Sequence, residues 1–363
     1  YGHVQSSKIV SSMKTWIDNS LQLRRQMVAN IAAEKNIEAS TIEKDWWVTM
    51  TLKALFQTSC SEYISFKGGT SLSKGWNLIN RFSEDIDLSL HHSFFGIEST
   101  SKSQREKLRK LSREYIVEKL SIELQQLMHG FGLRDCTILP ITMLEGYDAQ
   151  PIASDKDPVV LYVQYQSVLP HTSNYMLPFV KVEISCLSMD EPTELISLES
   201  MIHEAYPNYD VDAIVQARTV RPTRTFLEKA FLLCEEFQKD NPRTLRMTRH
   251  LYDLYKLAQT PFAKEALEDV ELYHKIVQHR KAYYHIKYVD YSLLFPDAIS
   301  FVPPENLIND YKADYHKHCA DTHKAYIHNR EHINSFIKQC DDKQHGNYVR
   351  QKAEHLFFIF HLR

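Results

Sequence analysis

Glycine is scarce in this chain: it occurs nine times in 363 residues, where average usage would supply roughly 25. So few glycines exclude flexible glycine linkers, collagen-like repeats and long glycine-rich loops. Three of the nine, Gly68, Gly69 and Gly75, nevertheless fall within eight residues. Because glycine permits backbone conformations and close approaches that other residues do not, this cluster marks a place where the chain requires them.

Long apolar runs and paired cysteines are missing as well. No apolar run exceeds five residues, whereas a membrane-spanning helix needs about 20, so the sequence predicts no membrane segment. Nothing in the first thirty residues resembles the core of a signal peptide. The six cysteines are scattered without a CxxC pair, which argues against a disulfide scaffold or a zinc knuckle. We therefore expect a cytoplasmic protein with reduced thiols.

The composition is otherwise that of an ordinary globular protein, 43% hydrophobic and 25% charged, with a formal net charge of −3. Its length predicts two domains. Strand signals fade after about residue 205, where helical periodicity takes over. We expect an α+β fold in which residues 1–205 form a mixed β-sheet flanked by helices and residues 206–363 form a mainly α-helical domain.

Hydrophobic periodicity places the individual elements. Strict alternation over residues 85–90 is typical of a half-buried strand. Further strands are expected at residues 63–66, 159–168 and 179–185. Helices are expected at residues 8–57, after Thr70 to about residue 80, and at 103–129, 221–238, 247–258, 264–284 and 310–338.

The clearest chemical signal lies in the strand predicted at residues 85–90. Side chains two apart on a strand point to the same face, so Asp85 and Asp87 lie side by side while Ile86 and Leu88 face the other way. Two adjacent carboxylates repel each other unless a cation lies between them. Hard oxygen ligands of this kind suit Mg²⁺ or Mn²⁺, so both residues are candidate metal ligands.

Two further segments supply complementary groups. The turn Gly68–Ser71, between a strand and a helix, offers backbone N–H groups and hydroxyls to a phosphate, and we expect its backbone to approach that phosphate closely. On the strand at residues 179–185, Glu183 shares one face with Lys181. An acidic pair, a third strand carboxylate and a phosphate-binding turn are the components of a two-metal phosphoryl-transfer site, in which Glu183 holds the second metal or takes a proton.

Each of these elements also has an ordinary structural explanation. A lone Asp-x-Asp is usually a solvated strand edge, and Gly-Gly-Thr is usually a tight turn. Glu183 with Lys181 is then a surface ion pair worth about 0–1 kcal/mol. The order of the three elements along the chain favours the functional interpretation. A group of C-terminal histidines is a weaker candidate metal site, for which solvent-facing side chains are the favoured explanation: His316, His318, His323, His328 and His332.

The helical half contributes a second set of candidates. On a helical wheel Lys229 lies at the margin of an apolar stripe, from which it can reach a phosphate in a cleft. Arg246, Arg249 and Asp253 share the charged face of the next helix. A solvated charged face is the ordinary explanation for the latter three.

The segments 68–74 and 81–88 resemble the signature of the AbiEii-type nucleotidyltransferase toxins. This type IV toxin–antitoxin family belongs to the polymerase-β-like nucleotidyltransferase superfamily. Residues 43–49 resemble the family's leading helix, and residues 224–229 and 249–253 resemble its later motifs. The resemblance implies a nucleotidyltransferase-like catalytic domain at residues 1–205 and a helical domain at 206–363 that completes the active-site cleft.

The resemblance also implies roles for individual residues. Asp85 and Asp87 match the metal ligands, Glu183 matches the third carboxylate, and Lys229 and Asp253 match essential residues of the second half. Similar proteins often have histidine where this chain has Cys234, so no imidazole role carries over. The candidate nucleotide-binding residues are Gly68, Gly69, Thr70, Ser71, Lys74, Arg246 and Arg249.

We therefore predict a metal-dependent enzyme that transfers a nucleoside monophosphate from an NTP to an acceptor hydroxyl. Lys229, with Arg246 or Arg249, neutralises the leaving pyrophosphate. The resemblance implies a tRNA 3′ end as the acceptor, and a toxin countered by a separately encoded antitoxin. The alternatives are a nucleotide- or RNA-binding module without transferase activity, and a transferase acting on a protein or a small molecule such as an aminoglycoside.

Two basic stretches lean towards a nucleic-acid acceptor. Residues 101–119 hold seven basic and three acidic side chains, and residues 218–256 hold nine and five. Local positive charge suits RNA backbones and triphosphates. Lysine-rich surface helices are common, however, and are the ordinary explanation.

Overall fold

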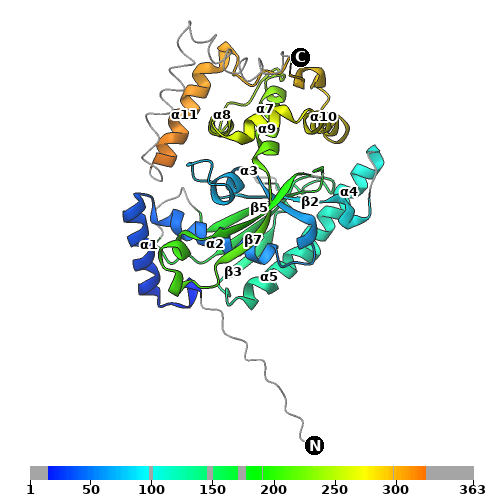
Figure 1. The fold of residues 1–363 in the computed structure, drawn as a ribbon. Helices are drawn as coiled ribbons and strands as arrows, with labels where there is room; N and C mark the ends of the chain where they lie inside the picture. The colour runs from blue at the N-terminus through cyan, green and yellow to red at the C-terminus, as the bar shows by residue number, and fades with distance from the viewer. Residues whose placement is uncertain are drawn as a thin grey trace, which may run out of the picture.

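The computed structural model describes residues 15–97, 101–144, 150–170, 177–189, 191–296 and 298–323. Within these ranges a seven-stranded mixed sheet with flanking helices is followed by a helical region (Figure 1). This arrangement confirms the α+β prediction. Of the five C-terminal histidines, His328 and His332 lie outside the described residues, and nothing is described of the other three side chains. No helix in the described ranges is long and apolar enough to cross a membrane.

The sheet places the segments predicted to carry chemistry at its centre. Its strand order is β3-β4-β5-β2-β1-β7-β6. β2 pairs antiparallel with β1 and parallel with β5, while β1 pairs parallel with β7. The remaining neighbours, β3–β4, β4–β5 and β6–β7, are antiparallel. The strands are β1 Ile64–Lys67, β2 Ile86–Leu90, β3 Cys136–Pro140, β4 Val159–Tyr165, β5 Phe179–Ser185, β6 Thr193–Glu199 and β7 Ile214–Val220.

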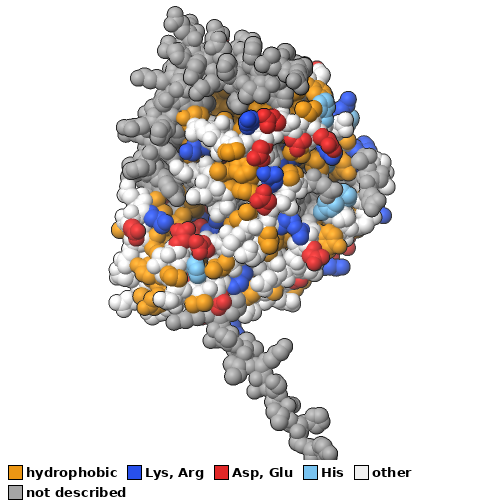
Figure 2. Space-filling view, viewed as in Figure 1, with side chains coloured by type: hydrophobic (Ala, Val, Ile, Leu, Met, Phe, Trp, Pro, Cys, Tyr) orange, Lys and Arg blue, Asp and Glu red, His pale blue; other side chains and the backbone are white. Residues whose placement is uncertain are grey.

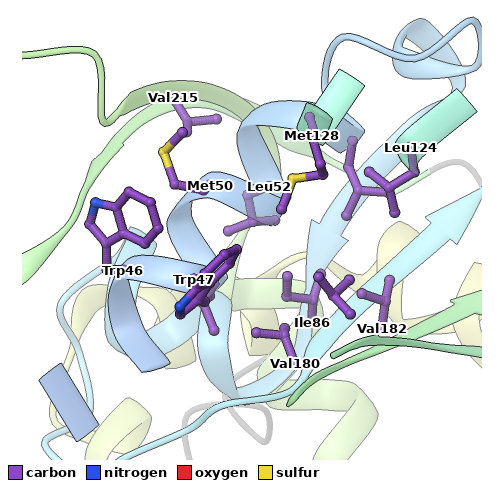
Figure 3. Packing of buried hydrophobic residues seen from close by; sticks show 14 of the residues in the cluster. Trp46, Trp47, Met50, Leu52, Ile86, Leu124, Met128, Val180, Val182 and Val215 are labelled. Carbon is purple, nitrogen blue, oxygen red and sulfur yellow. The ribbon is translucent and has the colours of Figure 1, made fainter. Parts of the chain in front are cut away.

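One face of the sheet is covered by α2 and α5. Alternation along β2 and β5 directs Ile86 and Val182 into a core shared with these helices (Figure 3). Trp47 of α2 is fully buried and stacks on Tyr165 of β4, with ring centroids 4.7 Å apart. Packing on this face fixes which side chains of β2 and β5 face the other way. The helices of this part are α1 Leu21–Lys35, α2 Ala39–Leu55, α3 Gly68–Thr70, α4 Lys102–Tyr115, α5 Ser121–Gly130 and α6 Met201–Ala205.

The helical region lies over the opposite, polar face of the sheet (Figure 1). Its hydrophobic core also includes Leu72 and Ile79, which come from the segment between β1 and β2. The indole nitrogen of Trp76 donates to the carbonyl of Val220 at the end of β7 (3.0 Å). The β1–β2 connection therefore packs against both parts of the protein. The helices of this region are α7 Pro222–Glu236, α8 Thr248–Ala258, α9 Pro261–Glu268, α10 Val270–His279 and α11 Ile308–His323.

The structure corrects several expected elements. The expectation that strands end near residue 205 is wrong, because β7 pairs with both β1 and β6. The strands β3 and β6 were not expected from the sequence. The helix expected to reach residue 80 ends with a π-helical turn at Ser71–Gly75. The helix expected over 264–284 is interrupted at Asp269, whose side chain caps α10 by accepting the N–H of Leu272 (2.9 Å). The helix expected over 8–57 breaks at Asn36, which adopts a left-handed conformation (φ 52°).

Candidate active site

Three carboxylates share the polar face of the central strands. Asp87 of β2 is the register partner of Glu183 on the parallel strand β5, and of Lys67 on the antiparallel strand β1. Asp85 comes two residues before Asp87, immediately before β2. Adjacent strands lie about 4.8 Å apart, so the structure brings the three acids that the sequence singled out onto one small area of the sheet.

Negative charge is poorly balanced on this area. Burial and the nearby carboxylates of Glu183 and Asp85 raise the pKa of Asp87 to about 7, despite the opposing effect of Lys67. Burial also raises the pKa of Asp85, again against the attraction of a lysine. Glu183 is engaged by Lys181 in a half-exposed ion pair, with an Nζ–Oε1 distance of 2.8 Å. Glu183 thus does form the expected ion pair with Lys181. The same carboxylate also raises the pKa of Asp87.

The donor set fits a divalent cation in chemistry. All three side chains offer hard carboxylate oxygens, and a cation would relieve the repulsion that raises the pKa of Asp87. Among the described residues, no three His, Cys, Asp or Glu side chains converge as a ready-made metal site. Binding of Mg²⁺ or Mn²⁺ by all three acids would therefore require their side chains to come closer together.

The raised pKa of Asp87 predicts a pH-dependent effect of Asp87→Asn on stability without metal. The carboxyl holds its proton more tightly in the folded protein, so its stabilising contribution is full below about pH 4 and is lost as the pH rises through about 7. In EDTA at pH 8, Asp87→Asn is expected to raise the melting temperature by a few degrees. At about pH 3.5 it is expected to change little, because the Asp87 carboxyl is then mostly protonated in both the folded and the unfolded protein. Equal stabilisation at the two pH values would contradict this explanation, and Glu118→Gln at an exposed position serves as the control.

The glycine turn accommodates side chains of the chain itself. Gly68 has φ +80°, and a Cβ atom at this position would lie 2.0 Å from Oδ2 of Asp87. A Cβ atom at Gly69 would lie 2.6 Å from Nη2 of Arg81 and 2.9 Å from Oγ of Ser83. The close approach that the glycines permit is therefore to Asp87, Arg81 and Ser83, rather than to open space awaiting a phosphate.

The hydroxyls of the turn hold it in shape. The Thr70 hydroxyl donates to the backbone carbonyl of Asp85, and its oxygen lies 2.9 Å from Oγ of Ser83. Ser71 donates to the carbonyl of Gly68 (2.9 Å), and both hydroxyl-bearing residues are buried. These bonds tie the turn to the start of β2, so their first effect is to position Asp85. A phosphate-binding role for Thr70 and Ser71 stays a prediction.

Lys74 has partners outside the acidic face. Its ammonium group lies 2.6 Å from Oδ1 of Asp45 in α2 and donates to the carbonyl of Glu199 in β6 (2.8 Å). Asp45 also accepts the N–H of Met201 at the start of α6 (2.8 Å). These contacts join the π-helical turn at Ser71–Gly75 to α2, β6 and α6. The assignment of Lys74 to a nucleotide therefore rests on the sequence pattern alone.

Asp253 of α8 links the two parts of the protein. It is fully buried and accepts two hydrogen bonds from Arg81, from Nε (2.7 Å) and Nη2 (2.6 Å). Nζ of Lys229 in α7 lies 2.9 Å from the same carboxylate. Burial alone would raise the pKa of Asp253, but Arg81 and Lys229 hold it well below its usual range. The solvated-face explanation is thus wrong for Asp253, and its partner Arg81 was not singled out by periodicity.

Arg246, just before α8, and Arg249, within α8, differ in exposure. Arg246 is exposed, and its backbone N–H donates to Oδ1 of Asp314 (2.5 Å). Arg249 is half-buried, and burial together with the charges of Arg81 and Arg246 lowers its pKa. The charges of Asp85 and Asp87 oppose this effect by raising the pKa of Arg249, so its guanidinium lies within electrostatic reach of the acidic face.

A second group of charges, buried between the sheet and the helical region, escaped the sequence analysis. We call it the buried charge cluster. Arg224 is 1% exposed, with Nη2 lying 3.2 Å from Glu191 and Nη1 lying 3.3 Å from Glu228. Burial lowers the pKa of Lys67, but Glu191 and Glu228 outweigh that effect and raise it. The cluster comprises Lys67, Glu191, Arg224, Glu228, Glu235 and Arg280.

The sequence signal for this cluster was limited. Arg224 and Glu228 have the i,i+4 spacing of a helical ion pair, which usually marks a surface. Cys234 is buried on the same helix, and its thiol donates to the carbonyl of Leu293 at 3.5 Å. Its position in the helical core is consistent with a packing role.

Comparison with known families agrees with this geometry. A family model described as "Nucleotidyl transferase AbiEii toxin, Type IV TA system" matches residues 51–328, well over half of the chain. The match includes both the acidic face of the sheet and the helices that carry Lys229 and Asp253. A search of curated proteins found no match to this chain.

Proposed function

The chain belongs to the AbiEii nucleotidyl transferase toxin family of type IV toxin–antitoxin systems, and from that premise we propose its reaction and site. It transfers a nucleoside monophosphate from an NTP to an acceptor hydroxyl, with a tRNA 3′ end as the acceptor, and acts in the cytoplasm. One observation carries the proposal. Asp85, Asp87 and Glu183 lie together on the sheet, facing cationic side chains of the helical region.

The three acids would hold Mg²⁺ or Mn²⁺. Bound metal supplies positive charge to the triphosphate and lowers the pKa of the attacking hydroxyl. We assign the proton of that hydroxyl to Glu183, the third carboxylate on the same face. The acceptor oxygen forms a bond to the α-phosphorus as the bond to the leaving pyrophosphate breaks, and Glu183 takes the proton.

Residues of both parts would bind the nucleotide. Lys229 and Arg249, with exposed Arg246 at the rim, would neutralise charge on the pyrophosphate. The backbone N–H groups of Gly68–Ser71 remain candidates for the phosphates. We retain a catalytic and a helical domain but assign residues 206–220 to the former, because β7 completes its sheet.

The proposal is tested by incubating the protein with each radiolabelled NTP, Mg²⁺ and total RNA. The wild type is expected to label RNA, and Asp85→Ala is expected to reduce labelling by at least about 1,000-fold, because one ligand of the reacting phosphate's metal is lost. Glu118→Ala, which removes an exposed carboxylate from the turn between α4 and α5, is the matched control and should label normally. The transferase proposal fails if the wild type and Asp85→Ala label RNA, protein and small molecules equally poorly.

The same experiment identifies the acceptor. Label in protein or in small molecules, with none in RNA, would replace the tRNA acceptor. NTP binding that is insensitive to Mg²⁺ and to loss of Asp87 would instead indicate a binding module. Basic and acidic side chains are interspersed on the face shown in Figure 2, so the local basic stretches do not form a patch of one sign in that view. Direct recovery of labelled RNA is therefore the informative measurement.

A further inference from the structure

Arg81 occupies a position that its place in the sequence does not reveal. It belongs to the connection between α3 and β2, but its guanidinium reaches Asp253 on α8, 172 residues later. It also lies over the backbone of Gly69, where a Cβ atom would come within 2.6 Å of Nη2. The side chain is thus enclosed between the glycine turn of the sheet domain and a helix of the other domain.

The hydrogen bonds of Arg81 are incomplete. A guanidinium has five N–H donors. Two are used by Asp253, and Nη1 makes a long contact to the carbonyl of Phe82 (3.5 Å). Within the described ranges the other two N–H groups have no protein partner, although the side chain is only 13% exposed. A buried guanidinium with spare donors is suited to an anionic ligand.

The surroundings of Arg81 carry excess positive charge. Lys229 shares the carboxylate of Asp253 with it, and the charges of Arg81 and Arg246 lower the pKa of Arg249. His250 stays neutral and adds no further charge, because burial and the neighbouring cations hold its pKa well below the usual value. In the described part of the chain, Nε of Arg249 and Nδ1 of His250 are buried without a hydrogen-bond partner. Arg81 and Lys229 thus share the single buried carboxylate of Asp253, and Arg249 lies within electrostatic reach of Arg81, so positive charge exceeds the charge of Asp253.

The position of this group relative to the acids defines its ligand. The charge of Asp87 raises the pKa of both Arg81 and Arg249, and the charge of Asp85 raises the pKa of Arg249. The cations therefore lie beside the carboxylates that would hold the metal. A ligand that contacts the cations directly and the acids through a bound divalent metal carries several negative charges along a short chain, as the β- and γ-phosphates of an NTP do.

We propose that Arg81 binds the pyrophosphate portion of the NTP, and that Asp253 is a positioning residue that holds Arg81 and Lys229 as a pair. This inference rests on the proposed function, because it specifies how the same site binds its nucleotide. It also gives Gly69 a purpose: the missing side chain leaves room for the Arg81 guanidinium. Asp253 itself has no contact with substrate in this arrangement.

The test measures binding of inorganic pyrophosphate by calorimetry in EDTA, so that the readout does not depend on metal or on turnover. Arg81→Lys keeps the charge but loses the two-pronged bond to Asp253, and it is expected to weaken binding about 10- to 100-fold. The matched control is Arg243→Lys, which breaks a similar two-pronged bond, to Glu236, at an exposed position. It should bind pyrophosphate within twofold of the wild type. Equal binding by Arg81→Lys and the wild type would overturn the proposal.

Asp253→Asn separates positioning from simple electrostatics. Removal of a negative charge beside an anion site should tighten pyrophosphate binding if Asp253 only repels the ligand. If Asp253 positions Arg81 and Lys229, binding should weaken instead, by about 10-fold or more. Tighter binding would contradict the positioning role, and circular dichroism of each variant checks that it is folded.

Steady-state kinetics distinguishes the nucleotide from the RNA backbone as the source of the phosphate. Arg81→Lys is expected to raise the KM for the NTP about 10-fold and to leave the KM for the acceptor RNA unchanged. The reverse pattern would assign Arg81 to RNA and overturn the proposal. A wild type that labels RNA, together with an Arg81→Lys variant that binds pyrophosphate normally, would defeat this inference and leave the proposed function intact.

Discussion

Replacing Gly68 by alanine is expected to abolish nucleotide transfer and to destabilise the sheet domain. The added Cβ would lie 2.0 Å from Oδ2, 2.8 Å from Cγ and 2.9 Å from Cβ of Asp87. Rotation of the Asp87 side chain cannot relieve the last of these contacts, so β1 and β2 must move apart. A displacement of about 1 Å at a catalytic group can cost about 100-fold in rate, and we expect at least that loss.

Gly132→Ala is the matched control for backbone strain. Gly132 has φ +85°, close to the +80° of Gly68, but no atom lies within 4 Å of its ideal Cβ position. Alanine in a left-handed conformation costs about 1–2 kcal/mol, so both variants lose this amount of stability. Only Gly68→Ala should also lose activity in the RNA-labelling assay. If the two variants retain similar activity, contact between Gly68 and Asp87 does not organise the site.

A large loss of stability is expected for Glu235→Ala. Glu235 of α7 accepts two hydrogen bonds from Arg280, one from Nε at 2.7 Å and one from Nη2, and both side chains are 6% exposed. Truncation leaves a buried guanidinium whose nearest remaining carboxylate, in Glu228, lies 3.9 Å from Nη1. Breaking a buried ion pair on one side costs about 3–5 kcal/mol, and Glu228 places the expected value near 3 kcal/mol. Urea denaturation followed by circular dichroism measures it.

Two comparisons test the reason for that loss. Glu271→Ala removes a carboxylate that lies 2.6 Å from Lys275 but is 78% exposed, and it should leave the denaturation midpoint almost unchanged. Glu235→Leu combined with Arg280→Met replaces both charges by apolar groups and should recover most of the lost stability. A double variant as unstable as Glu235→Ala would indicate that packing, rather than the unpaired charge, is responsible.

Local patterns predicted the acidic face well. Strict alternation over residues 85–90 indicated both the strand and the pairing of Asp85 with Asp87 on one face. The same reasoning put Glu183 on the polar side of β5, where it is the register partner of Asp87. The register itself was beyond reach, because it depends on hydrogen bonds between strands separated by almost a hundred residues.

The missed strands have weaker local signals for physical reasons. β6 lies at the edge of the sheet, where only one neighbour buries it, and Leu195 is 69% exposed. β7 does alternate, with Val215, Ala217 and Thr219 buried. This strand has only seven residues, however, and α7 begins almost directly after it. The change of period within a few residues hid the strand.

The contacts made by the predicted site residues were less accessible to sequence reasoning. Lys229 and Asp253 were both singled out, but not as partners of each other, because their pairing depends on how α7 packs on α8. Arg81 lies in the segment 81–88 that resembles the family signature, but no role was assigned to it. Lys74 was grouped with the turn by proximity in sequence, whereas the structure directs it to α2 and β6. Side chains that cross between elements are set by tertiary packing, which periodicity does not describe.

The bond between Arg81 and Asp253 also bears on when activity first arises during synthesis. At about 5–20 residues per second, a ribosome needs about 10–35 s to translate the 172 residues between the two partners. β1 likewise lacks its neighbour β7 until residue 220 has been made. A nascent chain that already contains Asp85 and Asp87 therefore has neither a complete sheet nor a positioned Arg81. For a member of a toxin family, this order means that activity which depends on the Arg81–Asp253 bond cannot arise before residue 253 has been made.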